Sequence, residues 1–390
     1  MASVSGSLFR RILFWAHLGS AITAGVFILV MSVTGVLLTY EHQMVDRAAH
    51  RNHIASTDAS LRMDADALAR IAQEISPGAR PSLVFVADPT APVTVSRGRD
   101  PAVLLSPVDG SVIRDSAAGL REFFRVVENW HRRLAGDNTS TRAKLIDYGN
   151  LLFLFIVVSG IYLWLPHAWR WRNLRGLMFF QARYVNAKVR DFNWHHVFSF
   201  WMLIPLFVIS LSGVVMSFDW ANRLVYAAYG EEAPQRRAAQ AAPGGQTAPA
   251  GTREARGASE DTSRASLESL RLAAIAQTPG WNRLTLPAAV EGPQVDVALE
   301  LKSTERRPPR QTVVLSTTDA SVIRVQPPPA ATQTPGQKAR NWMRFAHTGE
   351  QYGMIGQTIA GIASLAACFL VYTGFALAWR RLIRPLFRPA

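Results

Sequence analysis

The sequence has 390 residues, of which 49% are hydrophobic, with 42 Lys and Arg against 28 Asp and Glu. Its one cysteine, Cys368, excludes an internal disulfide, a cysteine-ligated zinc site and an iron–sulfur cluster. The net charge of +14 does not indicate nucleic-acid binding, because the apolar residues form four long runs and much of the excess charge lies beside them. The composition therefore indicates a membrane protein with large polar inserts.

The four apolar runs predict four transmembrane helices, at 12–40, 146–165, 193–218 and 353–380. Each reaches the roughly 20 residues that cross about 30 Å of hydrocarbon. The first run is too long for a cleaved signal peptide, and no A-x-A cleavage site follows it, so we expect an uncleaved anchor.

Basic residues predict the orientation of these helices. They precede the first run, crowd the loop 166–192 and return in the tail 381–390, which makes these segments cytoplasmic. Both termini then lie inside the cell. The inserts 41–145 and 219–352 face outward, into the periplasm if the membrane is a bacterial inner membrane.

The chain is a tandem repeat. Residues 102–115 align with 312–325 and are identical at eight of fourteen positions. Ser159-Gly160 aligns with Thr373-Gly374, and an Ala/Pro/Gly/Gln-rich tract at about 233–259 accounts for an insertion in the second half. That tract is predicted to be a disordered linker. Each repeat is predicted to be a helix, an outer domain and a helix.

Each outer domain is predicted to be an α+β unit of one helix against a small antiparallel sheet. Helical patterns at 64–75 and 267–276 precede alternating segments. Asp109-Gly110 and Asp319-Ala320 mark the equivalent hairpins.

Four motifs carry a resemblance to a known family. They are 16–19 (AHLG), 130–134 (WHRRL), 194–196 (WHH) and 346–350 (AHTGE). With these four motifs in this order, the chain resembles the PepSY-associated transmembrane family. That family includes inner-membrane ferric-siderophore reductases of the ferrioxamine reductase type. The resemblance implies two periplasmic PepSY-like domains, b-type haem held by histidine, and electron transfer to the iron of a ferric siderophore.

Four of the nine histidines occupy repeat-related positions, and these are the candidate haem ligands. His17 and His195 lie at the inner ends of their runs, where an unpartnered imidazole is costly. His131 and His347 precede the second and fourth runs. We expect two haem b groups per chain, each bound by one histidine from each repeat. His196 is an alternative to His195, and interfacial anchoring or helix capping is the alternative role for all of them.

Arg132, Arg133 and Arg344 are candidates to bind haem propionates, with solvated surface charge as the alternative. No dinucleotide or P-loop motif is present, so the electrons must come from a cytoplasmic protein or a membrane quinol. Expected partners are therefore a ferric siderophore, membrane lipid and this donor. Two other functions stay open: a haem-free PepSY binding or regulatory module, and an accessory protein for iron or haem transport.

Overall fold

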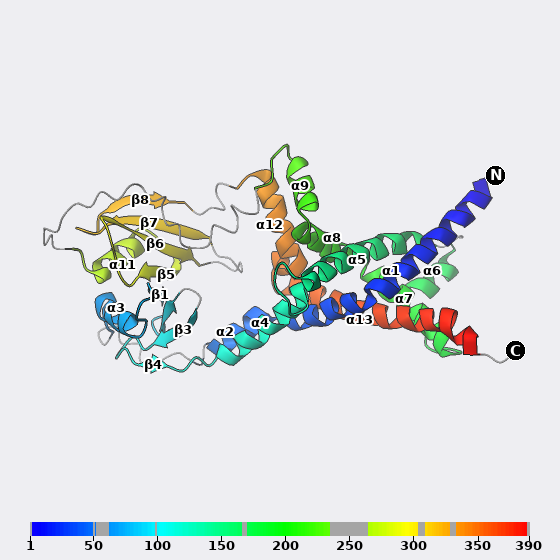
Figure 1. The fold of residues 1–390 in the computed structure, drawn as a ribbon, viewed down its shortest axis with the longest axis horizontal. Coiled ribbons are helices and arrows are strands. Elements are labelled where there is room, and N and C mark those ends of the chain that lie inside the picture. Colours follow the sequence, from blue (N-terminus) through cyan, green and yellow to red (C-terminus); the bar gives the residue numbers. More distant parts are fainter. Residues whose placement is uncertain are drawn as a thin grey trace. The chain divides into compact units, whose positions relative to one another are not determined.

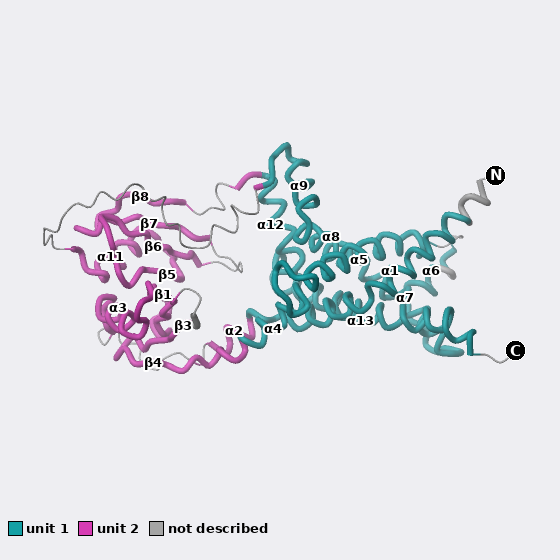
Figure 2. The backbone as a smooth tube through the Cα atoms, viewed as in Figure 1, with its two compact units in different colours: residues 1–42, 121–233, 335–390 teal, residues 43–120, 234–334 magenta. Residues whose placement is uncertain are grey.

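The computed structural model describes residues 2–49, 51, 62–97, 100–165, 170–234, 264–302, 309–327 and 333–387. The chain forms two compact units, drawn in two colours in Figure 2. The helical unit comprises 1–42, 121–233 and 335–390, and the sheet unit comprises 43–120 and 234–334. Most of the linker predicted at 233–259 lies outside the described residues.

Long helices make up the helical unit (Figure 1). Its helices are α1 (Ala2–Leu38), α4 (Ala118–Arg133), α5 (Thr141–Trp164), α6 (Trp171–Met178), α7 (Ala187–Trp201), α8 (Leu203–Ser217), α9 (Asp219–Ala227), α12 (Pro335–Thr348) and α13 (Gly353–Ala378). A short α2 (Glu41–Ala49) follows α1, and three single-turn helices, η4 (Glu350–Tyr352), η5 (Trp379–Ile383) and η6 (Arg384–Phe387), flank α13. α1 packs against α5 and α13, α7 packs against α13, and α8 packs against α5 and α12.

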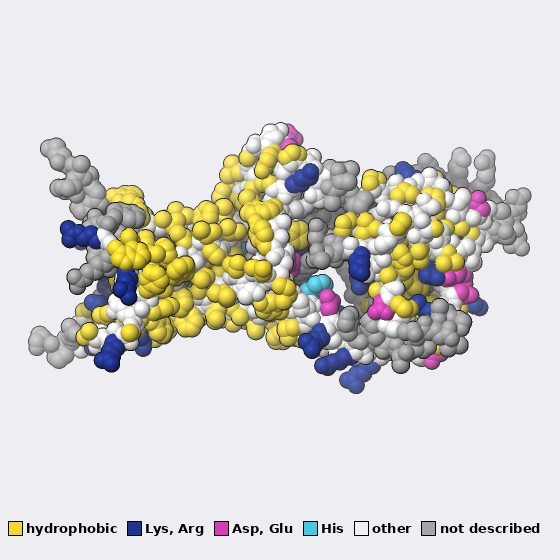
Figure 3. Space-filling model, turned by 180° about the vertical axis from the view of Figure 1, so that it is seen from behind, with side chains coloured by type: hydrophobic (Ala, Val, Ile, Leu, Met, Phe, Trp, Pro, Cys, Tyr) yellow, Lys and Arg dark blue, Asp and Glu magenta, His cyan; other side chains and the backbone are white. Residues whose placement is uncertain are grey.

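Apolar helices identify a membrane protein. Among the described residues, three helices are long and apolar enough to cross a bilayer, or four if the bent pair α7 and α8 forms one span. Hydrophobic side chains cover most of the visible face of this unit (Figure 3). Large apolar residues such as Ile204 and Ile355 are 75% and 74% exposed, which suits lipid contact better than water contact.

The third apolar run differs from the continuous helix expected at 193–218. It is divided at Met202 into α7 and α8, which meet at a bend of 69°. Pro205 explains the break, because its nitrogen has no proton for the carbonyl of Trp201 and its ring would clash with that carbonyl. The equivalent position in the first repeat is Phe27, and α1 continues through it.

The inserts 41–145 and 219–352 form one sheet. Its eight strands are β1 (Ser82–Val86), β2 (Val93–Arg97), β3 (Asp100–Leu105), β4 (Val112–Ile113), β5 (Trp281–Pro287), β6 (Gln294–Leu301), β7 (Arg310–Ser316) and β8 (Val322–Gln326), in the order β4-β3-β2-β1-β5-β6-β7-β8. Helices α3 (Ala65–Glu74) and α11 (Leu267–Ala276) pack on this sheet. Buried leucines, valines and alanines from both halves make one core between helices and sheet.

The structure corrects the expectation of a separate α+β domain in each repeat. Each half does supply one helix and four strands, but β1 pairs antiparallel with β5, from Ser82 opposite Pro287 to Val86 opposite Arg283. This pairing satisfies the backbone groups of two strands that would otherwise be sheet edges. In addition, α4, α9 and α12 fall within the predicted inserts 41–145 and 219–352 but belong to the helical unit.

Helices α3 and α11 cap each other. The Asp66 carboxylate accepts hydrogen bonds from the backbone N–H groups of Leu267 and Glu268, at 2.8 and 3.1 Å. The Glu268 carboxylate in turn accepts from the N–H of Ala65 at 3.0 Å. A carboxylate at a helix N-terminus pairs with otherwise unsatisfied N–H groups. These reciprocal contacts join the two halves through their helices as well as through β1 and β5.

The equivalent hairpins predict a stabilising substitution. Gly110 and Ala320 occupy matched turn positions with φ of 70° and 58°, a region that is strained for alanine. We expect Ala320→Gly to stabilise the β7–β8 hairpin by about 0.5–1 kcal/mol, measured by hydrogen exchange in the full-length protein. Gly110→Ala is the contrasting variant, because its Cβ would lie 2.3 Å from Ile71 Cδ1, and it should lower protection of β3 and β4. Equal protection in both variants would contradict this account.

Candidate functional site

The four repeat-related histidines lie on four helices of the helical unit. His17 is on α1, His131 on α4, His195 on α7 and His347 on α12. The rings of His131 and His347 have centroids 6.3 Å apart. His17 is close enough to His195 for their imidazoles to interact electrostatically. The structure thus brings the four side chains together in two pairs. From their predicted positions we call His17 and His195 the inner pair, and His131 and His347 the outer pair.

Hydroxyl groups anchor the inner pair. His17 Nδ1 lies 2.8 Å from Ser159 Oγ on α5, and His195 Nδ1 lies 2.9 Å from Thr373 Oγ1 on α13. Ser159 and Thr373 are aligned by the repeat. The two imidazoles are therefore held in the same way, each by a helix of its own half of the chain.

The outer pair is anchored in the same manner. His131 Nδ1 lies 2.9 Å from Thr34 Oγ1, and His347 Nδ1 lies 3.1 Å from Ser212 Oγ and 2.9 Å from the carbonyl of Ile209. Thr34 and Ser212 are again repeat mates. Burial, with a contribution from His347, lowers the pKa of His131 to about 4, and burial also lowers the pKa of His347. Both imidazoles are thus neutral at physiological pH, which a metal ligand requires.

The anchoring hydroxyls favour the imidazole tautomer that carries its proton on Nδ1. Each hydroxyl donates its single proton to a carbonyl of its own helix: Ser159 to Ile156, Thr373 to Phe369, Thr34 to Val30 and Ser212 to Val208. With its proton engaged in this way, each hydroxyl oxygen can accept from Nδ1, which favours the tautomer whose Nε2 keeps its lone pair. No hydrogen bond engages these Nε2 atoms among the described residues. All four imidazoles therefore present a nitrogen that can bind a metal.

The spacing of the outer pair fits one metal ion between two imidazoles. Two metal–nitrogen bonds of about 2 Å each span about 4 Å of the 6.3 Å separation, and the remainder matches the two ring radii. A pair of imidazoles supplies two ligands. The arrangement thus suits an ion that brings its remaining ligands with it, as haem iron does.

The inner pair has a flat helix surface beside it and a polar group without a partner. A Cβ at Gly160 would lie 3.5 Å from His17 Cε1, and one at Gly374 would lie 3.8 Å from His195 Cε1, so the two rings lie next to the helices at these glycines. One turn beyond Gly160, the Nε1 of Trp164 is buried and has no hydrogen-bond partner among the described residues. A buried N–H without an acceptor is costly, which favours a bound group that supplies one.

His196 differs from the four anchored histidines. Its Nδ1 lies 2.8 Å from the carbonyl of Phe192 on its own helix, and its ring packs on the Phe192 ring. Between the two adjacent candidates on α7, His195 has the contacts that match those of His17. His196 contacts its own helix instead.

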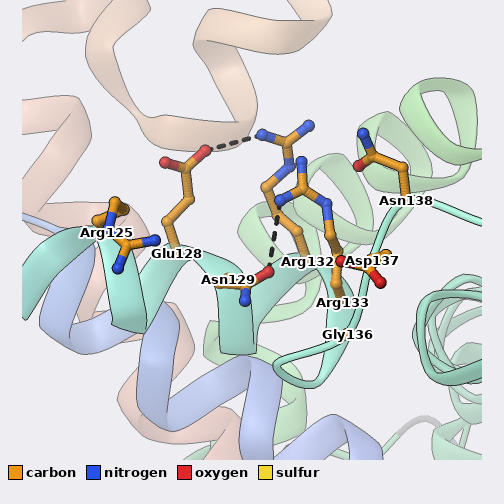
Figure 4. A pocket seen from close by; sticks show the side chains of 8 residues that line it. All are labelled: Arg125, Glu128, Asn129, Arg132, Arg133, Gly136, Asp137 and Asn138. Atoms are coloured by element: carbon orange, nitrogen blue, oxygen red, sulfur yellow. Dashed lines mark hydrogen bonds and ion pairs between the residues drawn. The ribbon is translucent and has the colours of Figure 1, made fainter. Parts of the chain in front are cut away.

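Two of the three candidate arginines line a polar pocket of about 340 Å³ at the end of α4 (Figure 4). Arg132 forms an ion pair with Glu128 at 2.8 Å, and Arg133 donates a long hydrogen bond of 3.4 Å to Asn129. Arg344 lies on α12, three residues before His347, and does not line this pocket. The guanidinium groups of the pocket can bind an anion, although Arg132 already has a carboxylate partner.

Sequence reasoning missed the four hydroxyl partners and a buried carboxylate. The repeat alignment matches Thr34 with Ser212 and Ser159 with Thr373. A hydroxyl at the same position in both halves of the chain, within an apolar run, was therefore the available signal. Asp191, the acidic residue of the basic loop, is fully buried and forms ion pairs with Arg190 and Arg380. Its ion pair with Arg380 depends on η5, far along the chain, which the local sequence does not reveal.

Comparison with known proteins supports the expected relationship. A family model described as the PepSY-associated TM region matches residues 14–381, which is nearly the whole chain and includes all four anchored histidines. No curated protein matches the chain. The resemblance of the chain to this family is thereby confirmed.

Proposed function

The chain belongs to the family of PepSY-associated transmembrane proteins, and from this premise we propose that it is a haem-containing reductase of the bacterial inner membrane. It passes electrons across the membrane to a ferric siderophore in the periplasm, and the iron is released as Fe(II). The observation that carries this proposal is the set of four imidazoles, each fixed through Nδ1 with Nε2 free, in two pairs.

Two haem b groups are the cofactors of this reductase. His17 and His195 would hold one, and His131 and His347 the other, each pair taking one ligand from each repeat. Haem supplies reversible one-electron chemistry. The protein residues fix the imidazole orientation through Thr34, Ser159, Ser212 and Thr373. In this role Arg132, Arg133 and Arg344 bind propionates, because guanidinium matches carboxylate geometry.

The proposed arrangement in the membrane is four spans in two tandem repeats. The repeated hydroxyl–histidine contacts support it, and so do the basic flanks. Arg10, for example, donates to the carbonyls of Leu163 and Leu165, which connects the start of α1 with the end of α5 at the side proposed to be cytoplasmic. The sheet unit then lies in the periplasm, where it contributes to binding of the ferric siderophore.

The chemistry at the outer face is one-electron reduction. Ferric iron is a hard ion that prefers oxygen ligands such as hydroxamates, and the added electron weakens their hold. One electron is consumed per ferric ion and no bond in the chelator is broken. The protein would position the ferric siderophore and tune the reduction potential of the haems.

Optical spectroscopy of the purified protein tests this proposal. Oxidised and dithionite-reduced spectra, with haem quantified per chain, should give a low-spin b-type signal and about two haems. The dithionite-reduced protein should then be reoxidised by a ferric trihydroxamate while Fe(II) is trapped by a ferrous chelator. A protein that stays colourless after expression with ample haem would refute the reductase and favour a haem-free binding module.

The anchoring hydroxyls should tune haem affinity. Thr373→Val keeps the side-chain shape but removes the acceptor for His195 Nδ1, so we expect the inner haem to transfer to apomyoglobin about 10–100-fold faster. Thr373→Ser retains the hydroxyl and should behave like the wild type. Thr23→Val removes a hydroxyl that bonds only the carbonyl of Gly19 on α1, and it should change nothing. Unchanged transfer in Thr373→Val would contradict the anchoring role.

A further inference from the structure

An aromatic groove lies beside the helix that carries His195. We define the α6 groove by Trp171, Arg175, Phe179, Phe180 and Gln181, which line a space of about 970 Å³. That volume is within the usual range for small-molecule sites. Trp171, Phe179 and Phe180 are 66%, 44% and 54% exposed, so three aromatic faces are available to a ligand.

A buried amide holds the loop that follows α6 and carries Phe179, Phe180 and Gln181. Asn193, which is 2% exposed, donates to the carbonyls of Gly176 and Phe179 at 2.8 and 3.1 Å. Its side-chain oxygen accepts from the Tyr184 hydroxyl at 2.8 Å and from the N–H of Gln181 at 3.3 Å. A buried amide with these bonds holds the groove loop against α7. The loop thus has a defined position in the helical unit.

Ring contacts connect the groove with the surroundings of His195. Phe180 packs against Trp194 and Phe198, with ring centroids 6.4 and 5.4 Å apart. Phe198 stacks on Phe369 of α13 at 5.2 Å. Trp194 is the residue before His195, and Asn193 is two residues before it. The groove is thus in contact, through Phe180, with Trp194, the residue before His195.

The composition of the groove favours a flat, apolar ligand with polar oxygens. Its aromatic faces can stack on a ring, and the Arg175 guanidinium can donate to a ring oxygen. α6 is short and carries tryptophan and arginine, which are typical of the membrane interface, where such a ligand would arrive from the lipid. The proposed reductase needs a reductant, and the chain has no nucleotide-binding motif.

We propose that the α6 groove binds a membrane quinol and is the entry point of electrons. This inference rests on the proposed reductase function. The quinol loses two electrons and two protons and becomes the quinone. The electrons leave one at a time toward the inner pair and finally reduce two ferric ions to two ferrous ions, while the two protons pass to water on the side of the groove.

The test uses full-length, haem-loaded protein in lipid nanodiscs with a short-chain benzoquinol. Trp171→Ala and Arg175→Ala should slow haem reduction by the quinol at least tenfold and leave reduction by dithionite unchanged. Trp220→Ala, at a 46% exposed tryptophan of α9, is the matched control and should match the wild type. A photoactivatable benzoquinone should label residues 171–182 with or without haem, and excess quinone should prevent the labelling.

The outcomes separate this inference from the proposed function. If dithionite-reduced protein delivers electrons to a ferric trihydroxamate but the quinol neither reduces nor labels the protein, the quinol site is wrong and the reductase stands. If phosphatidylglycerol displaces the label and quinone does not, the groove is a lipid site and the inference is overturned. A protein that binds no haem would refute the reductase, and labelling of 171–182 would then still report on the groove itself.

Discussion

Replacing His131 with alanine is expected to reduce the haem content of the purified protein from about two groups per chain to about one. The ring centroids of His131 and His347 lie 6.3 Å apart, so removal of one imidazole would leave the outer haem with one of its two proposed protein ligands. Reduction of a ferric trihydroxamate should fall at least 100-fold, because the electron path loses its outer step. Haem assay per chain and the rate of Fe(II) trapping measure the two effects.

The variant His347→Ala should have the same defect, and the double variant should be no worse, because the two residues act as one unit. His196→Ala is the matched control. It removes an imidazole that bonds its own helix through Phe192, so both haems should remain. If His131→Ala retains two haems with an unchanged spectrum, the outer pair is structural and the proposed electron path fails.

The sequence predicted the pairing of the histidines because the two members of each pair occupy matched positions in the two repeats. The offset of 178 that relates His17 to His195 also relates Thr34 to Ser212. In the second part of the repeat, His131 matches His347 at an offset of 216, and Ser159 matches Thr373 at an offset of 214. A duplicated chain tends to duplicate its contacts, so matched positions are candidates for matched interactions. The same reasoning, applied to the hydroxyls, would have identified the anchors before the structure was known.

Other features depend on interactions between distant segments. The joining of two four-stranded halves through β1 and β5 was not predictable, since either strand alone has the pattern of an ordinary strand with one buried face. The bend at Met202 was predictable from Pro205, which the hydropathy of the run conceals. The local sequence pattern thus predicts the individual helices and strands. Which strand pairs with which is decided by contacts with distant segments.

The buried carboxylate of Asp191 predicts the second large effect. Asp191 and His195 are four residues apart on α7, and Arg380 and Thr373 are seven residues apart along α13 and η5. Two contacts therefore join these segments on one face: the Asp191–Arg380 ion pair and the hydrogen bond from His195 to Thr373. Asp191 has no exposed side-chain surface, and Arg380 is 20% exposed. Loss of the ion pair should loosen the segment that orients His195.

We expect Asp191→Asn to lower the free energy of unfolding by about 3 kcal/mol and to release the inner haem faster, because the Arg380 charge is left largely buried without its partner. Thermal denaturation in detergent and haem transfer measure the two effects. Adding Arg380→Gln should recover much of the stability, since the unpaired charge is then gone. Glu291→Gln breaks an ion pair whose side chains are 84% and 74% exposed, and it should cost less than about 1 kcal/mol. A double variant less stable than Asp191→Asn would show that the loss is not due to the unpaired arginine.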